Sequence, residues 1–153
     1  MKAFGETFRL VLDVLVDSNF LLLSISKRFD MFSEIESLVQ RRVHFLTIPQ
    51  VVAELKKLES KRGPRVSKEA ALALQLANRC TVVPFDAVPG EDTDTSLLRA
   101  AKRYSAAVAT ADVKMRGMLR ENHLPIISLR GRRLYCEPGD PELWFLGGSQ
   151  KDI

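Results

Sequence analysis

Apolar residues fall into two kinds of segment along this chain: short continuous runs, and longer stretches with helical spacing. The short runs occupy residues 10–16, 43–48, 81–85, 106–109 and 125–129. Continuous apolar runs of this length are typical of strands buried on both faces of a parallel sheet. A less apolar run at 132–136 predicts an edge strand. The pattern therefore predicts a sheet of about six strands.

Helical spacing separates the predicted strands. We expect helices to begin at 20 and to cover 32–39, 50–60, 70–76, 94–104 and 113–122. Pro49 suits a first helical turn, Ser67 suits an N-cap, and residues 61–65 read as a basic loop. Arg41 and Arg42 would close the helix before them, where cations interact favourably with the helix dipole.

Alternation of strands and helices favours an α/β fold, and specifically a three-layer α/β/α sandwich with a central, mainly parallel sheet. Residues 1–137 would form one domain. The breakers from Pro138 to Pro141 would begin a C-terminal tail, 138–153, with a polar, mobile end. In that tail, Trp144 and Phe145 could serve a homodimer contact or pack on their own core.

Composition narrows the class of protein. The chain is 46% hydrophobic and 27% charged, as expected of a globular domain with a real core. No run approaches about 18 apolar residues, and the N-terminus lacks a signal-peptide pattern, so we expect a cytoplasmic protein with no membrane partner. The two cysteines and two histidines lie far apart, which disfavours a disulfide or a zinc site.

Positive charge is concentrated in the second half of the chain. The net charge is +4, and residues 94–133 hold nine Lys or Arg against three acids. Such a stretch is either a solvated surface or a contact for a polyanion such as RNA. The candidates for phosphate contacts are Lys114, Arg116, Arg120, Arg130, Arg132 and Arg133.

Four acids occupy positions that differ from those of ordinary solvated surface acids. Asp17 and Asp112 follow predicted strands, and Asp94 begins a predicted helix whose apolar residues Leu97, Leu98 and Ala101 lie within roughly 60° of it. Glu54 lies on the shoulder of the apolar arc of its helix. Three of the four are thus at strand–helix junctions expected on one edge of the sheet, where open α/β sheets bind ligands.

Each acid also has a structural interpretation. Asp94 and Asp112 could be helix N-caps, and Asp17 could be a turn residue. Glu54 could pair with Lys57 at i,i+3. His44 and His123 have no sequence partner that suggests a catalytic triad, so we assign them structural roles.

Taken together, the four acids favour a catalytic site that binds a cation. Converging carboxylates repel one another unless a cation lies between them, and hard oxygen ligands suit Mg²⁺ or Mn²⁺. A cation held by carboxylates beside a basic surface suits phosphodiester hydrolysis.

The same residues carry a family resemblance. Four segments, at 15–23, 49–55, 94–101 and 108–112, resemble the PIN-domain ribonucleases in order and spacing, within a match from about Val11 to Leu134. The resemblance implies a PIN-like nuclease domain and metal-dependent endoribonuclease activity on single-stranded RNA. It implies catalytic acids at Asp17, Glu54, Asp94 and Asp112, of which Asp17, Asp94 and Asp112 would hold Mg²⁺ or Mn²⁺. Asn19 and Thr110 match supporting positions.

Residues 116–120 and 124–130 look like the archaeal and eukaryotic ribosomal-RNA-processing branch, which implies a ribosome-assembly partner. Two features depart from that branch. Thr95 stands where a second acid often follows the third, and a cysteine-rich metal site has no counterpart. The alternatives are a toxin ribonuclease held by an antitoxin, and an RNA-binding scaffold that does not cleave. A phosphatase with a nucleophilic Asp17 is disfavoured, because Asn19 replaces the second acid it would need.

Overall fold

The computed structural model describes residues 11–61 and 63–145. The first ten residues, where the absence of a signal peptide was inferred, lie outside the described part. So do residues 146–153, the predicted polar end of the tail.

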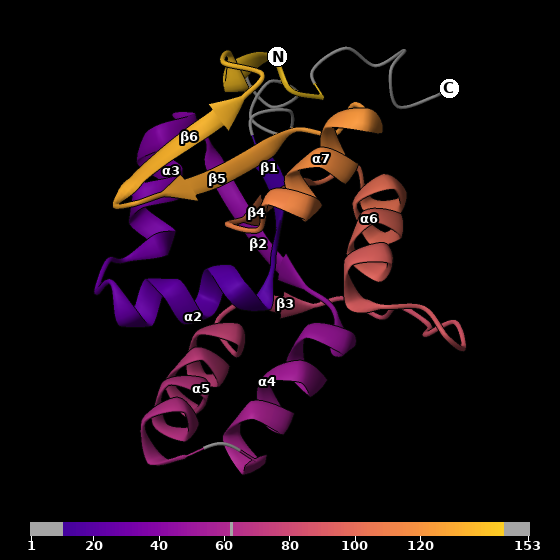
Figure 1. The fold of residues 1–153 in the computed structure, drawn as a ribbon. Helices are drawn as coiled ribbons and strands as arrows, with labels where there is room; N and C mark the ends of the chain where they lie inside the picture. Colours follow the sequence, from indigo (N-terminus) through magenta and orange to yellow (C-terminus); the bar gives the residue numbers. More distant parts are fainter. Residues whose placement is uncertain (1–10, 62, 146–153) are drawn as a thin grey trace.

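Six strands form a single sheet in the order β3-β2-β1-β4-β5-β6 (Figure 1). Five run parallel, and β6 pairs antiparallel with β5. The strands are β1 (Val11–Val16), β2 (Arg42–Thr47), β3 (Thr81–Val82), β4 (Ala107–Thr110), β5 (Ile126–Arg130) and β6 (Arg133–Glu137). The predicted mainly parallel sheet is confirmed, and so is the edge strand predicted at 132–136, which is β6.

Helices cover the sheet and complete the predicted three-layer sandwich. They are α2 (Ser18–Ser26), α3 (Met31–Val39), α4 (Pro49–Lys61), α5 (Pro64–Ala77), α6 (Thr93–Tyr104) and α7 (Val113–Glu121), followed by the short η1 (Pro141–Leu143). In Figure 1, α2 and α3 lie across the sheet from α6 and α7, and the α4–α5 pair projects beyond one edge of the sheet.

The winding of the chain fixes where a ligand site can form. From β1 the chain crosses to β2 and then β3, whereas β4 and β5 lie on the other side of β1. Right-handed crossovers in these two directions place helices on opposite faces. The carboxyl ends of β1 and β4 are therefore a topological switch point, where neighbouring connections diverge and leave a crevice.

A continuous apolar core holds this edge in place. Val14, Leu15 and Val16 of β1 are fully buried, as are Val108 and Ala109 of β4. The backbone N–H of Asp17 donates to the carbonyl of Ala109 across 3.1 Å, which extends the β1–β4 pairing to the last residue before α2. The residues that follow both strands are thus fixed relative to each other.

Three details of the sequence prediction are wrong. The third strand has two residues, because Pro84 has no N–H to donate and pairing ends after Val83 donates to Thr47. The loop between α4 and α5 is shorter than predicted, since Gly63 is the N-cap and Pro64 is the first residue of α5. Ser67 lies inside that helix, and its hydroxyl donates to the carbonyl of Glu59 across 2.7 Å.

Arg41 and Arg42 do not close α3, which is the third error. Gln40 ends that helix in the left-handed conformation, and Arg42 begins β2. Arg41 is buried, and its Nη1 donates to the carbonyls of Pro141 and Trp144 at 3.1 and 2.9 Å. It thereby ties the segment after β6 to the domain.

Trp144 is 5% exposed and belongs to the core, so of the two roles considered for it the structure shows packing on its own domain. Among the helices of the described residues, none combines the length and apolar character needed to cross a membrane.

Candidate active site

Asp17 occupies the switch point and is almost completely enclosed. It is the N-cap of α2 and is 5% exposed. Its Oδ2 accepts a hydrogen bond from the Thr110 hydroxyl at 2.7 Å, and its Oδ1 accepts one from the backbone N–H of Asn19 at 3.4 Å. Burial raises the pKa of Asp17, the charges of Glu54 and Asp112 raise it further, and these hydrogen bonds act against the rise.

Asp112 reaches the same place from β4. As predicted for its structural role, it is the N-cap of α7, with Oδ1 accepting from the backbone N–H of Lys114 at 3.0 Å. Its own N–H donates to the Thr110 hydroxyl at 3.1 Å. A cap uses one carboxylate oxygen, so the second oxygen can serve another ligand.

Asp94 does not act as the N-cap of its helix. Asp92 is the cap, with Oδ1 accepting from the N–H of Thr95 at 2.9 Å, and Asp94 lies in the first turn of α6. Burial, together with the charges of Asp17, Asp112 and Asp92, raises the pKa of Asp94 to about 6. The carboxylate is therefore free of the capping role and exposed to the field of the other acids.

Glu54 approaches from the α4 side. It makes no ion pair with Lys57; instead its Oε1 accepts a hydrogen bond from the Ser18 hydroxyl at 2.5 Å. Ser18 also lies 3.4 Å from Asp17 Oδ1, so this hydroxyl stands between two of the acids. Ser18 was not identified from the sequence, although its position directly after Asp17 was a usable signal.

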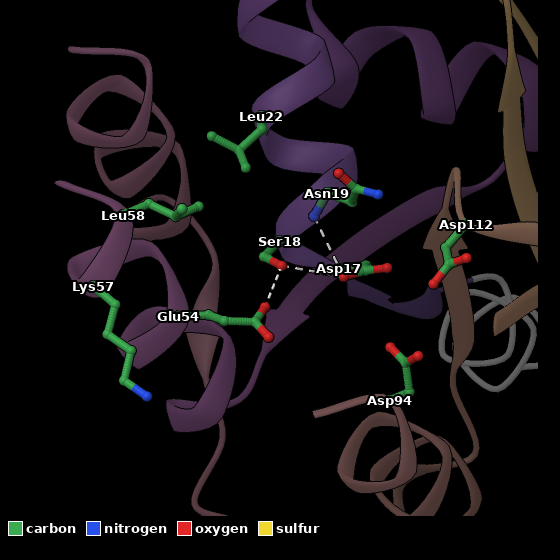
Figure 2. A pocket seen from close by; sticks show the side chains of 9 residues that line it. All are labelled: Asp17, Ser18, Asn19, Leu22, Glu54, Lys57, Leu58, Asp94 and Asp112. Atoms are coloured by element: carbon green, nitrogen blue, oxygen red, sulfur yellow. Dashed lines mark hydrogen bonds between the residues drawn. The ribbon is translucent and has the colours of Figure 1, made fainter. Parts of the chain in front are cut away.

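All four predicted acids line one hollow of about 430 Å³ at the carboxyl edge of the sheet. Figure 2 shows their carboxylates pointing into it from α4, α6 and the ends of β1 and β4. Sequence reasoning missed an apolar and basic wall opposite Asp94 and Asp112. The full lining consists of Asp17, Ser18, Asn19, Leu22, Glu54, Lys57, Leu58, Asp94 and Asp112.

The two supporting residues differ in their surroundings. Thr110 is fully buried and connects Asp17 to the Asp112 backbone, whereas the exposed Asn19 lies at the rim of the hollow. Thr110 holds the acids in relative position, and Asn19 is accessible to a ligand.

The donor chemistry of the hollow suits a hard divalent cation, because four carboxylates line it and neighbouring acids raise the pKa of both Asp17 and Asp94. Within residues 11–61 and 63–145, however, no three Asp, Glu, His or Cys side chains are clustered as a preformed metal centre. The acids line a common space and remain separated within it, as uncompensated carboxylates do.

The six predicted phosphate contacts do not form one group. Arg116, Arg120 and Arg130 line a second hollow of about 340 Å³ together with Val113. Lys114 is close enough to the acids to oppose the pKa rise of Asp94. Arg132 and Arg133 are exposed at the turn between β5 and β6.

His44 has partners that the sequence did not reveal. Its Nδ1 lies 3.2 Å from Asp13 Oδ1, and its Nε2 lies 2.9 Å from the Thr81 hydroxyl. These contacts link β1, β2 and β3. His123 adopts a positive φ of 57° in the turn after α7, which is a structural position.

The protein thus has an open α/β fold with an acidic hollow at its topological switch point. The model of the PIN-like domain matches residues 14–132, so the chain belongs to that family. No curated protein matches the sequence.

Solved structures share the fold. The PIN domain endonuclease Utp24 aligns with a TM-score of 0.67 and 23% identity, covering 82% of this chain and 90% of that one. A domain of a functionally unknown protein from Methanocaldococcus jannaschii aligns at 0.58 and 16%, covering 80% and 94%. VapBC2 from Rickettsia felis, bound to a DNA fragment from the promoter, aligns at 0.57 and 15%, covering 78% and 100%.

Proposed function

We propose that this protein is an Mg²⁺- or Mn²⁺-dependent endoribonuclease that hydrolyses phosphodiester bonds of RNA. The observation that carries the proposal is the convergence of Asp17, Glu54, Asp94 and Asp112 on one hollow at the switch point. Membership of the PIN-like domain family supports it, since the fold is a nuclease fold.

Asp17, Asp94 and Asp112 are the proposed holders of the cation. Thr110 binds the Asp17 carboxylate and the Asp112 backbone, and Asp94 is free of the helix cap. Each oxygen of Asp17 keeps a lone pair for a ligand, and the second oxygen of Asp112 is not used by its cap. When bound, the cation would stabilise charge on the phosphate and lower the pKa of a water beside it.

Glu54 has a separate role in the proposal. Its carboxylate is oriented by the Ser18 hydroxyl, and in Figure 2 it approaches from the opposite side of Asp17 to Asp94 and Asp112. From there it can accept a hydrogen bond from the attacking water and direct it toward the phosphorus. Lys57 and Asn19 lie on the same hollow and are accessible to the substrate.

Asp17→Asn and Asp112→Asn proteins test the proposal on single-stranded and structured RNA in Mn²⁺. Both should fail to cleave, because each loses a carboxylate charge at the hollow. Asp86→Asn is a matched control, since Asp86 is exposed and uses its backbone carbonyl, which the substitution keeps, to accept from Arg99. Cleavage by both site variants at the wild-type rate would refute the assignment.

For the biological role we propose processing of precursor ribosomal RNA in the cytoplasm, alongside ribosome-assembly proteins. The support is the resemblance of residues 116–120 and 124–130 to that branch, together with the shared fold of the Utp24 endonuclease. Depletion should cause a ribosomal-RNA precursor to accumulate, and an Asp112→Asn copy should not restore its maturation.

A toxin ribonuclease is the second candidate, and the likeness to VapBC2 favours it. Under this alternative a protein antitoxin would cover the acidic hollow. Induced expression would then arrest growth, and a neighbouring reading frame for a short partner would relieve the arrest. Wild-type protein that binds RNA in EDTA but never cleaves it would instead identify a scaffold.

A further inference from the structure

The second hollow is built from two elements that meet beside the acidic one. Val113, Arg116 and Arg120 recur at i, i+3 and i+7 and so share one face of α7. Arg130, the last residue of β5, lines the hollow from the neighbouring strand. We call this space, lined by Val113, Arg116, Arg120 and Arg130, the arginine trough.

One of the three arginines is already neutralised. Arg120 makes a bidentate ion pair with Glu137, in which its Nε contacts Oε2 and its Nη2 donates to Oε1 at 3.0 Å. Arg130 lies over the ring of Tyr135, with its guanidinium carbon 5.0 Å from the centroid. A ring face leaves the edge donors of a guanidinium free to bind an anion.

All three cations act on Glu137. The hydrogen bond and charge of Arg120 hold the pKa of Glu137 below its ordinary value, and the charges of Arg130 and Arg116 lower it further. Three arginines thus face one carboxylate, so the trough carries a local excess of positive charge.

Arg116 carries a buried hydrogen-bond donor. Its Nε is buried and has no hydrogen-bond partner in the described part of the chain. A buried donor without an acceptor is costly, and charged donors more so. The guanidinium of Arg116 can therefore bind a further partner, because no acceptor for its Nε lies among residues 11–61 and 63–145.

We propose that the arginine trough binds a backbone phosphate of the RNA strand next to the phosphate that is cleaved. This inference rests on the proposed function for its choice of RNA. Arg116 follows Asp112 by four residues on the same side of α7, an axial rise of about 6 Å. The trough and the acidic hollow therefore adjoin along one helix, and a strand can occupy both.

The position of Arg130 indicates in which direction the bound RNA strand would cross the sheet. Thr110 pairs with Ser128 in the β4–β5 register, and Arg130 lies two residues beyond Ser128. Asp17 and Asp112 thus follow β1 and β4, and Arg130 ends β5, so the three lie in order along the carboxyl edge. The bound RNA would run along this edge from the acids toward β5. Arg116 and Arg130 would donate hydrogen bonds to the phosphate next to the one that is cleaved.

Binding of a short labelled oligouridine to the full chain in EDTA tests this without cleavage. Arg116→Gln combined with Arg130→Gln should weaken binding about tenfold. It should also reduce the salt-dependence slope by about 0.7 for each phosphate that the variant no longer neutralises. The matched control is Arg42→Gln combined with Arg103→Gln, which removes two exposed charges, one at the start of β2 and one near the end of α6.

The control should change affinity by less than about twofold, because charges beyond a Debye length are screened. Equal losses in the two double variants would overturn the proposal.

Glu137→Gln provides a second measurement that does not rely on loss of binding. By releasing Arg120 it should strengthen oligouridine binding. An unchanged or weaker affinity would also overturn the proposal.

Inorganic phosphate distinguishes the two sources of the anion. If the trough serves RNA, inorganic phosphate should bind far more weakly than the oligouridine; equal affinity would indicate a site for free phosphate and overturn the proposal. Wild-type protein that binds as expected in EDTA but shows no cleavage in Mn²⁺ would contradict the proposed function and leave the trough supported.

Discussion

The Thr110 hydroxyl donates to Asp17 Oδ2 across 2.7 Å, joining the ends of two adjacent parallel strands. The Thr110 hydroxyl oxygen in turn accepts a hydrogen bond from the backbone N–H of Asp112 at 3.1 Å. One fully buried side chain therefore sets the relative position of two of the four acids, and it does so without offering the ligand a donor of its own.

Thr110→Val should separate this positioning role from mere packing, because valine has nearly the same shape. Loss of the hydroxyl leaves the enclosed Asp17 carboxylate short of a donor, which should raise its pKa further and cost about 1–3 kcal/mol of unfolding free energy. Cleavage should fall about 10–100-fold, with the acidic limb of the pH–rate profile moved to higher pH. Thr110→Ser, which keeps the hydroxyl, should restore that limb; if it does not, the hydrogen bond is not the cause.

Asp94 should make the metal-free protein less stable as pH rises through the weakly acidic range. Its folded pKa of about 6 exceeds the unfolded value of about 3.9, so the folded state binds the proton more tightly. The stabilisation is complete below about pH 4 and is lost as pH approaches 6.

Urea unfolding in EDTA at several pH values checks this dependence. Asp94→Asn should lose the part of the pH dependence that belongs to Asp94, should be more stable than wild type at neutral pH, and should not cleave RNA. An Asp94→Asn protein with the pH dependence of the wild type would contradict the interpretation.

Removal of the divalent cation should lower the thermal midpoint of the wild-type protein. A ligand that binds only the folded state stabilises it by about 2.7 kcal/mol at a hundredfold excess over Kd. Mn²⁺ should therefore raise Tm, and Asp17→Asn or Asp94→Asn should lose most of that increase. The Asp86→Asn control should show the same increase in Tm as the wild type. A wild-type Tm that does not change on addition of Mn²⁺ would argue against a metal in the hollow.

Ser18→Ala should weaken cleavage by releasing Glu54 from the 2.5 Å hydrogen bond that orients it. Because the two residues are in contact, their effects should not add. A double-mutant cycle with Glu54→Gln measures this: the double variant should be little worse than Glu54→Gln alone. Strictly additive losses would mean that Ser18 acts independently of Glu54.

Arg41→Met should loosen the segment after β6. It removes the buried charged donor that binds the carbonyls of Pro141 and Trp144, at a cost of about 2 kcal/mol. Limited proteolysis should then cut near these residues, whereas the Arg42→Met protein, altered at an exposed residue, should resist as the wild type does.

Truncation after residue 137 tests the predicted domain boundary itself, and we expect it to destabilise the domain because Trp144 is part of the core.

The sequence predicted the sheet, and it predicted that the four acids meet at one edge of that sheet, because both depend on local pattern. Continuous apolar runs such as the one ending at Val16 have few alternatives to a buried strand, and parallel strands bring their carboxyl ends to one edge. Asp94 was predicted to share the apolar face of its helix, and the structure shows it in the first turn with its pKa raised by burial and by the other acids.

What the sequence could not predict depends on contacts between distant residues. Nothing local distinguishes Arg41, which binds carbonyls a hundred positions away, from a cation at a helix terminus. The pairing of Glu54 with Ser18 rather than Lys57, and of His44 with Asp13 and Thr81, likewise emerges only once the strands and helices are packed. The third strand was overestimated because its apolar run continues past the point where Pro84 stops hydrogen bonding.

That early stop at Pro84 has a consequence for assembly. β3 is an outer strand of the sheet, yet it has only two residues, and its pairing ends at Val83, directly before Pro84, which has no backbone N–H. Such an edge offers a poor template for adding a strand from a second molecule. Dimers or complexes of this protein should therefore not form by continuing the sheet beyond β3, which leaves that side of the molecule protected against edge-to-edge aggregation.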